Sequence, residues 1–426
     1  MCFAPGCDQG YGPTTEMDNQ TRELESDHAD VRRAFGNCIS LPLLATNRVR
    51  VANARRVHVI APAGSSSQAD SAIVRDVLNF VAQANSTETQ FNALALALFA
   101  HQVHNNAPFQ RFCVQRGKTV RTVKDWRDIP AVPINAFKDL TLSCAPTPDC
   151  ARVFMTSGTT RADVKGRHYH PSLAVYDLSM TRNFRLHFMP GPERLRMGIL
   201  FPTEELMPNS SLAHYLALAL SEFGSPGSGY FLGAQGLETA RLCAFLEQAE
   251  KSQEPVALLG ASYSFVHLLD ALQQLGRKFS LPAGSRFLDT GGFKGQSREL
   301  SAEDFYRQLS ATFGITPADC INMYGMTELS TQFYDRGNQT LPSTKVGPHW
   351  IRTRIVDPLT GAELAHGERG ILAHCDLANF NSVTTILTED VGMATPGGFL
   401  LLGRAQGAQA KGCSMAVDEF LQAAKP

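Results

Sequence analysis

The chain has 426 residues, with 39 Lys and Arg against 40 Asp and Glu and a formal net charge of -1. This balance argues against a nucleic-acid binder, which needs a surplus of Lys and Arg to hold phosphates. No apolar run reaches the roughly 20 residues that span a bilayer, and no secretory leader opens the chain. We expect a cytoplasmic protein of two or three structural units, with no membrane insertion and no nucleic-acid partner.

Residues 1–68 differ in composition from the rest of the chain. Met1–Gln20 is rich in turn formers and lacks periodicity, and Ala61–Gln68 (APAGSSSQ) is typical of a linker. We predict an N-terminal extension without chemistry of its own. The ten cysteines of the whole chain form no CxxC pair or zinc-type cluster, so they are expected to be reduced thiols.

Residues 69–346 alternate between helical and strand patterns. Apolar residues recur at helical spacing from Ser71, helix formers continue over Asn92–Val103, and the prolines of Trp126–Leu140 favour an extended path over the surface. Strands are then expected at Val153–Met155, Leu195–Phe201, Val256–Leu259 and Phe287–Asp289, with helices at Leu212–Phe223 and Tyr263–Leu275. This alternation predicts a layered α/β core around a mainly parallel sheet.

The pattern changes after Gly347, where apolar runs are joined by turns. Strands are expected at Ile351–Val356, Gly370–Ala373, Ser382–Leu387 and Gly398–Leu402. Residues 347–403 are therefore predicted to form a small β-rich module that completes the core at 69–346. Residues 404–426 are too few for a domain of their own and form a truncated C-terminal segment.

A loop rich in Ser, Thr and Gly follows the first strand of the predicted core. Phe154–Thr160 reads FMTSGTT, and Lys165 and Gly166 come shortly after. The hydroxyl and N–H groups of such a loop can wrap phosphate oxygens, and a lysine supplies a point charge. An ordinary Ser/Thr turn is the alternative. The P-loop pattern GxxxxGK[ST] is absent.

Three further motifs follow in order along the chain. Asn322–Glu328 reads NMYGMTE, where an aromatic ring beside glycine can lie over a flat base and Thr-Glu can hold a metal ion bound to phosphate. Thr388–Gly392 reads TEDVG, in which one carboxylate can accept both hydrogens of a ribose diol. Gly403 and Arg404 form the last motif. Each of them, taken alone, is compatible with a surface turn.

Taken in this order, the motifs resemble the adenylate-forming superfamily of acyl- and aryl-CoA synthetases and firefly luciferase, from about Ser71 to the C-terminus. The resemblance implies ATP and Mg²⁺ as cofactors. By this resemblance, the ATP phosphates are expected to contact Thr156, Ser157, Gly158, Thr159, Thr160 and Lys165. Adenine is expected to contact Tyr324, Gly325, Gly291 and Gly292. The α-phosphate and Mg²⁺ are expected at Thr327 and Glu328, the ribose at Asp390, and either ribose or phosphate at Arg404. The loop departs from the family pattern, because Arg161 replaces a usual Gly and Lys165 lies one residue late.

Within the superfamily, the phrases YGMTELSTQFYD and KGCSMAVDEF and the short C-terminus resemble the acyl-protein synthetase subunit of bacterial bioluminescence fatty-acid reductases. That resemblance implies activation of a fatty acid as acyl-AMP and transfer to a cysteine, for which Cys413 is the matching position. It also implies an acyl reductase subunit or a carrier protein as partner. The usual C-terminal lysine is missing, and Lys165 and Lys411 are the candidates to replace it.

Cys413 has a second interpretation as a buried small hydrophobe. Lys411, Gly412 and Arg404 favour the acyl-carrier role, because positive neighbours lower a thiol pKa and an adjacent glycine permits close approach.

By the same resemblance, His214, Ser262 and Tyr263 are expected to contact the acyl substrate. His168 and His170 (HYH) are interpreted as a polar strand edge, not as metal ligands. Glu328 and Asp390 are expected to act in adenylation and not in folding.

The sequence thus predicts a ligase that forms an acyl adenylate and passes the acyl group to a thiol. Its own cysteine is the expected acceptor. Coenzyme A or a carrier-protein thiol is the alternative acceptor, and a non-catalytic acyl-binding scaffold is the alternative of another class.

A chain beginning at Ala69 is expected to keep the acid-dependent exchange of pyrophosphate with ATP and most of its stability. The reason is that residues 1–68 lack the periodicity of a core element. Exchange assays and thermal unfolding of the full and shortened chains check this expectation. An insoluble or unfolded short chain would show that the extension packs on the core.

Overall fold

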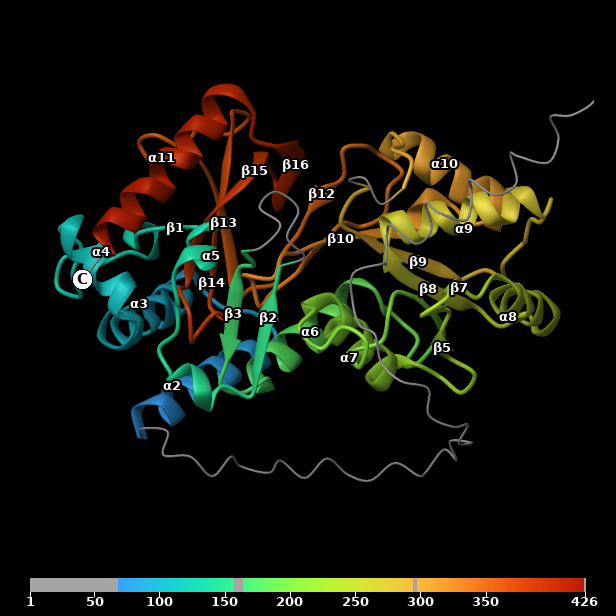
Figure 1. Cartoon of the computed structure of the whole chain (residues 1–426), viewed down its shortest axis with the longest axis horizontal. Helices are drawn as coiled ribbons and strands as arrows, with labels where there is room; N and C mark the ends of the chain where they lie inside the picture. The colour runs from blue at the N-terminus through green and yellow to red at the C-terminus, as the bar shows by residue number, and fades with distance from the viewer. Residues whose placement is uncertain (1–67, 157–163, 294–296, 425–426) are drawn as a thin grey trace, which may run out of the picture. The chain divides into compact units, whose positions relative to one another are not determined.

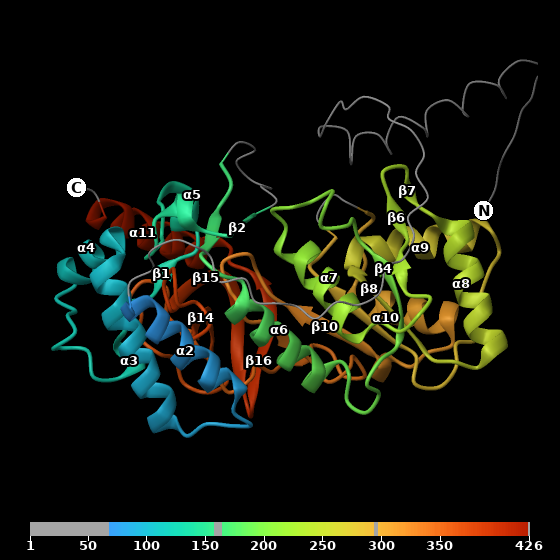
Figure 2. The same cartoon turned by 90° about the horizontal axis from the view of Figure 1, so that it is seen from below.

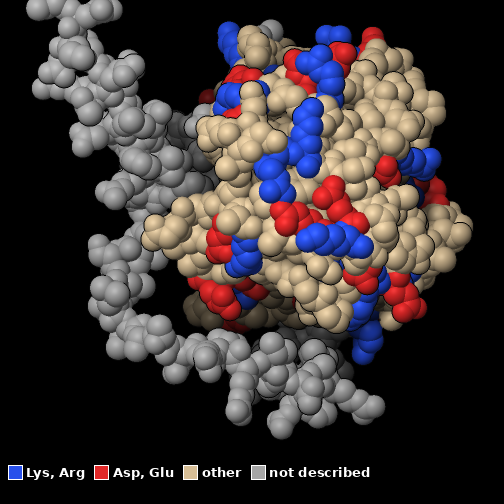
Figure 3. All heavy atoms as spheres, turned by 90° about the vertical axis from the view of Figure 1, so that its right-hand side faces the viewer, with Lys and Arg blue, Asp and Glu red and all other residues tan. Residues whose placement is uncertain are grey.

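The computed structural model describes residues 68–156, 164–293 and 297–424 (Figure 1). The description that follows concerns the unit Ala63–Pro426, as far as its residues are described. Almost all of the predicted extension at 1–68 lies outside the described residues. Among those that are described, no helix combines the length and apolar character needed to cross a bilayer. Lys and Arg are interspersed with Asp and Glu on the face seen in Figure 3.

A mostly parallel six-stranded sheet forms the centre of the α/β part. Its order is β11-β10-β9-β8-β4-β5, and only β11 is antiparallel to its neighbour. The strands are β4 (Arg196–Leu200), β5 (Gly229–Tyr230), β8 (Val256–Ala261), β9 (Arg286–Thr290), β10 (Cys320–Tyr324) and β11 (Phe333–Tyr334). The predicted strands at β4, β8 and β9 are confirmed.

Helices cover both faces of this sheet (Figures 1 and 2). Successive side chains of a strand point to opposite faces. Leu258 and Phe287 accordingly pack with one set of helices, and Leu259 and Leu288 with the other. The first set is α8 (Thr239–Ser252), α9 (Ser262–Gln274) and α10 (Ala302–Phe313); the second is α6 (Ala174–His187) and α7 (Ser211–Phe223). The predicted α/β layering is confirmed.

A second, mainly antiparallel sheet has the order β12-β16-β15-β14-β13, with β1 parallel to β15. The strands are β1 (Val132–Pro133), β12 (Thr344–Lys345), β13 (Ile351–Val356), β14 (Arg369–Asp376), β15 (Thr385–Thr395) and β16 (Gly398–Arg404). The four predicted strands are present, although the third begins at Thr385 and not at Ser382. Because β1 and β12 precede residue 347, this sheet also draws on the preceding chain.

Three helices pack with the second sheet in one apolar cluster. They are α2 (Gln68–Ala82), α3 (Glu88–Asn105) and α4 (Ala107–Gln115). The shorter elements are η1 (Trp126–Asp128), α5 (Ala136–Asp139), η2 (Thr147–Asp149), β2 (Arg152–Met155), β3 (Arg167–His170), β6 (Leu232–Gly233), β7 (Gly236–Leu237) and η3 (Pro317–Asp319). The extended path expected within Trp126–Leu140 is present at β1, but the segment does not lie on the surface, because Trp126, Ile129 and Phe137 are buried in the apolar cluster.

The C-terminal segment forms a helix, α11 (Gly407–Ala423), which lies beside β1, β15 and α4 (Figure 1). Phe420 is fully buried, and its ring meets that of Phe112 edge-on at 4.6 Å. Glu419 forms an ion pair with Arg116. The segment after Arg404 is therefore docked on the core.

Candidate active site

The two sheets meet at the carboxyl end of β10, the edge at which parallel α/β sheets bind their ligands. Tyr324 is the last residue of β10, and its hydroxyl donates a hydrogen bond to Oδ2 of Asp390 in β15 at 2.8 Å. The Nε of Arg404 lies 3.1 Å from Oδ1 of the same carboxylate. Burial and the charge of Asp390 raise the pKa of Tyr324 well above its usual value. Three residues singled out in three motifs thus lie together.

A bulge in β15 positions Asp390. The register against β14 shifts, so that extra residues of β15 protrude between Leu387 and Val391. The hydroxyl of Thr388 donates to the carbonyl oxygen of Leu372 at 2.9 Å and accepts from the N–H of Asp390 at 3.0 Å. The threonine hydroxyl therefore replaces the ladder hydrogen bonds that the bulge removes from the Leu372 carbonyl and the Asp390 N–H. This role gives the threonine of the TEDVG motif a structural reason.

Glu328 lies against the base of the Ser/Thr/Gly loop. Two hydrogen bonds between Thr156 and Gly166, of 3.0 and 2.9 Å, join the two ends of that loop. A Cβ atom on Gly166 would lie 3.0 Å from Oε1 of Glu328, so only glycine fits here without displacement. Lys165, the residue before, is exposed. The predicted phosphate contacts Ser157, Gly158, Thr159 and Thr160 fall outside the described residues.

The Glu328 carboxyl is 3% exposed, and burial raises its pKa to about 7. The positive charges of Lys138 and Arg404 act in the opposite direction, and the negative charge of Asp390 adds to the rise. Glu328, Asp390 and Arg404 are therefore close enough to share one electrostatic environment. Lys138, in α5, is a neighbour that no sequence motif indicated.

Buried polar groups hold the segment after Tyr324 in place. The Nδ2 of Asn379 donates to the carbonyl oxygen of Glu328 at 2.9 Å, and Asp376 accepts from the N–H groups of Ser330 and Thr331 at 3.0 and 2.9 Å. Burial raises the pKa of Asp376 to about 6. These residues follow or end β14, and no local pattern in the sequence distinguishes them.

His168 holds the same segment from the other side. Its Nδ1 donates to the carbonyl oxygen of Thr327 at 2.9 Å, so its Nε2 accepts from the hydroxyl of Ser382 at 3.0 Å. Burial lowers its pKa to about 4, which keeps the ring neutral. His168 and His170 lie in β3, which pairs only with β2 among the described strands, as the interpretation of a strand edge expected, but both side chains are buried and not exposed at that edge.

Gly291, Gly292 and Gly325 are exposed just beyond the ends of β9 and β10. These are neighbouring parallel strands, so the glycines lie at the same edge of the sheet as Tyr324. Gly291 has a φ of 81°, a left-handed conformation that disfavours other residues. Their predicted role beside adenine stays a prediction, as does stacking by Tyr324, which is 8% exposed.

The predicted substrate residues belong to two other networks. Both ring nitrogens of His214 meet carboxylates, Glu204 at 2.8 Å and Asp177 at 2.9 Å. Burial alone would lower the pKa of His214, but these two carboxylates outweigh it and raise the pKa. The hydroxyl of Ser262 donates to buried Asp289 at 2.7 Å. Tyr263 is partly buried, with its ring 6.3 Å from that of His267.

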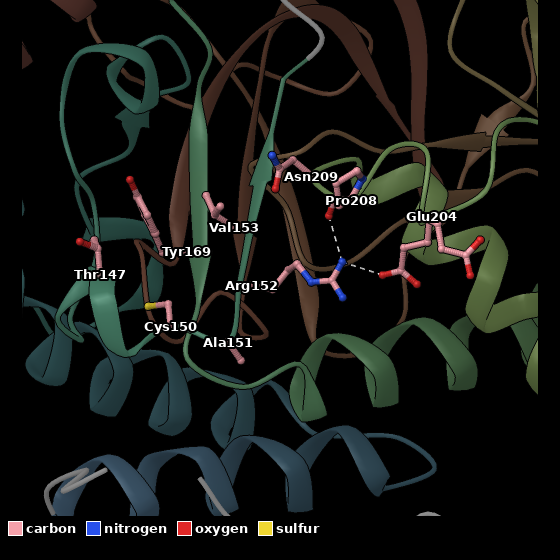
Figure 4. Close-up of a pocket in the computed structure, with 10 residues that line it drawn as sticks. Thr147, Cys150, Ala151, Arg152, Val153, Tyr169, Glu204, Pro208 and Asn209 are labelled. Atoms are coloured by element: carbon pink, nitrogen blue, oxygen red, sulfur yellow. Dashed lines mark hydrogen bonds and ion pairs between the residues drawn. The ribbon is translucent and has the colours of Figure 1, made fainter. Parts of the chain in front are cut away.

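A cavity of about 520 Å³ adjoins the His214 network (Figure 4). Arg152 extends across it, with its guanidinium 2.7 Å from Glu204 and 2.9 Å from the carbonyl oxygen of Pro208. Arg152 starts β2, whereas the Ser/Thr/Gly loop follows the end of that strand. The cavity and the loop are thus at opposite ends of the β2–β3 hairpin.

Cys413 lies in a different environment from the one expected. It is 3% exposed, packs with Leu387 and Val391, and its thiol is 3.9 Å from the carbonyl oxygen of Thr388. Burial, together with the charges of Glu389 and Asp390, raises its pKa to about 11. The expectation of a lowered thiol pKa is therefore wrong for this arrangement. Lys411 is exposed, so its ammonium is solvated and has little influence on the thiol.

The oxygen groups present fit a magnesium ion. Mg²⁺ is usually held by one or two carboxylates together with substrate phosphates. Buried Glu328 supplies one carboxylate beside the base of the predicted phosphate loop. Within the described parts of the chain, no group of three or more His, Cys, Asp or Glu side chains forms a metal site without a ligand. The protein alone therefore offers a partial site that phosphates would complete.

Comparisons with known proteins show which fold and which relatives the chain resembles. The structure of 2-hydroxyisobutyryl-CoA ligase in the postadenylation state, in complex with 2-HIB-AMP, aligns with a TM-score of 0.56 and 14% identity, covering 75% of this chain and 69% of that one. Long-chain-fatty-acid–luciferin-component ligases are 23% identical over 340 residues (Vibrio harveyi; 78% of this chain, 88% of that protein) and 22% identical over 338 residues (Aliivibrio fischeri; 76% and 86%).

The fold is that of the adenylate-forming ligases. A family model described as acyl-protein synthetase, LuxE, matches residues 62–422. The chain belongs to this LuxE acyl-protein synthetase family, and it is an enzyme of the ligase class. The resemblance inferred from the motifs is confirmed, whereas the role of each site residue stays a prediction.

Replacement of Glu328 by Gln is expected to stabilise the protein above pH 7. A raised carboxyl pKa means that the folded state binds more protons than the unfolded state, so stability falls as pH rises from 4.5 to about 7. The Gln variant escapes this loss, which is on the order of 3 kcal/mol.

Urea unfolding of both proteins at pH 4.5 and pH 8 tests this prediction. The two should have equal free energies of unfolding at the lower pH and diverge at the higher one. Equal stability at pH 8 would show that Glu328 ionises there without penalty. Glu328 is thus expected to affect folding stability as well as adenylation, because its ionised carboxylate is buried.

Proposed function

We propose that this enzyme activates a long-chain fatty acid with ATP and Mg²⁺ and then carries the acyl group on Cys413. The observation that carries the proposal is the convergence of Tyr324, Glu328, Asp390 and Arg404 where the two sheets meet. The names of the relatives support a long-chain fatty acid as substrate. An acyl reductase subunit in the cytoplasm is the recipient that we propose for the acyl group.

In the first half-reaction, a carboxylate oxygen of the acid attacks the α-phosphorus of ATP, and pyrophosphate leaves. Such chemistry depends mainly on positioning and on neutralising charge. Asp390 accepts the ribose hydroxyls, exchanging its bonds to Tyr324 and Arg404 for them. The positive charges of Arg404, once freed from Asp390, and of Lys138 and Lys165 then help to neutralise the negative charge that develops on the phosphates. A magnesium ion held by Glu328 would neutralise phosphate charge.

In the second half-reaction, the sulfur of Cys413 attacks the acyl carbonyl, AMP leaves, and the thiol proton passes to solvent. Cys413 packs among apolar side chains, whereas Asp390 pairs with Tyr324 and Arg404. The thiol therefore has to leave this apolar cluster to reach the adenylate, and α11 has to shift with it. Leaving the cluster also removes the burial that holds the thiol pKa near 11, which increases the thiolate fraction.

Replacement of Asp390 by Ala is expected to weaken ATP binding in the exchange of pyrophosphate with ATP, and Glu328→Gln to slow this exchange by about 10²-fold. The exchange is measured with and without added fatty acid, on which it should depend. The matched control is Glu222→Gln, which changes an exposed carboxyl near the end of α7, away from the site and the groove. If both site variants exchange like the wild type, the assignment of the site is wrong. A wild-type enzyme without exchange would indicate a scaffold.

Replacement of Cys413 by Ser is expected to separate the two half-reactions. Exchange continues, because adenylation does not use the thiol, but covalent labelling by radioactive acid and ATP is lost. Cys243→Ser is the control, since Cys243 is also a buried cysteine in a helix. The Cys243→Ser protein should still acquire the acyl label, and hydroxylamine should release that label, as it releases a thioester. Label that persists in Cys413→Ser, or that moves to added coenzyme A, would identify another acceptor.

A further inference from the structure

A groove of about 680 Å³ runs between α11 and the turn that joins β13 to β14. Its floor includes the buried side chains of Val356, Ala373 and Leu387. Two large apolar side chains stand exposed at its mouth, Leu359 with 64% and Met415 with 53% of their surface accessible. Its volume lies in the range of pockets that enclose small organic ligands.

The floor of the groove and the thiol of Cys413 belong to the same apolar cluster. Val356, Ala373 and Leu387 pack in one cluster with Cys413, and Ala416 borders both the cluster and the groove. Gly412 also lines the groove, one residue before the cysteine. A group attached to the sulfur therefore enters the groove by displacing only apolar contacts.

The charged residues at the rim largely neutralise one another. Arg116 pairs with Glu419 at 2.5 Å, and Lys118 with Asp128 at 3.1 Å. Two further cations line the groove. Arg127 pairs with Glu88 and Asp125, both at 3.2 Å. Burial lowers the pKa of Arg354, and the negative charge of Glu363 acts in the opposite direction. An anionic ligand would have to break these pairs, whereas an uncharged chain lying on the floor leaves them intact.

We propose that this groove holds the aliphatic chain of the acyl group once it is attached to Cys413. The inference rests on the proposed function, since it requires the thioester at Cys413. After transfer, α11 returns to its docked position, and the chain lies on Val356, Ala373 and Leu387 beneath Leu359 and Met415. Each buried methylene strengthens this docking by about fourfold. The thioester is then sheltered from water until the acyl group is passed on.

A photoreactive fatty acid tests where the chain lies. The full-length enzyme is acylated with ATP and a long-chain acid that carries a diazirine along its chain, freed of excess reagent and irradiated. Peptide mass spectrometry is expected to find cross-links to the turn at 358–363 and to Met415. Cross-links confined to other parts of the chain would overturn the inference. If Cys413 is acylated but no cross-link falls in the groove, the inference about the groove is refuted and the proposed function stands. If Cys413 is not acylated, the proposed function is refuted as well.

A substitution at the mouth of the groove gives a second measurement. In Leu359→Glu, a carboxylate at the mouth should shorten the lifetime of the purified acyl-enzyme by about tenfold and remove its dependence on chain length. Leu186→Glu is the matched control, because Leu186 is equally exposed, on α6, and should leave the lifetime unchanged. Equal lifetimes in all three proteins would overturn the inference. Lifetimes are compared at equal initial acylation.

Discussion

The site depends on one constraint, the fixed path of the chain as it leaves the parallel sheet and meets the antiparallel one. Backbone groups buried away from water need partners. Asn379 and Asp376 supply them from one side of this path, and His168 does so from the other. These bonds place Glu328 between the base of the loop at Thr156 and the carboxylate of Asp390. The charges at the site are thus positioned by groups that are themselves inaccessible to substrate.

This construction makes the burial of Glu328 compatible with the role in adenylation that we propose for it. A carboxyl that is so little exposed loses stability on ionisation unless a cation comes close. Lys138 and Arg404 provide part of that compensation in the protein alone. A divalent cation with its phosphates would provide the rest, so the ionised form of the site is best stabilised when the ligand is present. Natural sites commonly accept such a loss of stability for function.

Local patterns in the sequence predicted the elements whose apolar periodicity is strong, such as β8 and α7, and the motifs that converge at Tyr324. They failed where long-range packing decides the outcome. Helix α11 has glycines at both Gly407 and Gly412, and it is stabilised by the burial of Phe420, which no local pattern indicates. The roles of Asp376 and His168 likewise depend on partners distant in the chain.

Thr388 makes two contacts that serve different parts of the molecule. Its hydroxyl completes the bulge that presents Asp390, and its carbonyl oxygen faces the thiol of Cys413 on α11. A nucleotide that shifts this bulge would therefore also change how firmly the helix is seated. By thermodynamic linkage, seating of the helix changes nucleotide affinity by the same factor. Under the function that we propose, this one residue would make nucleotide affinity differ before and after Cys413 is acylated.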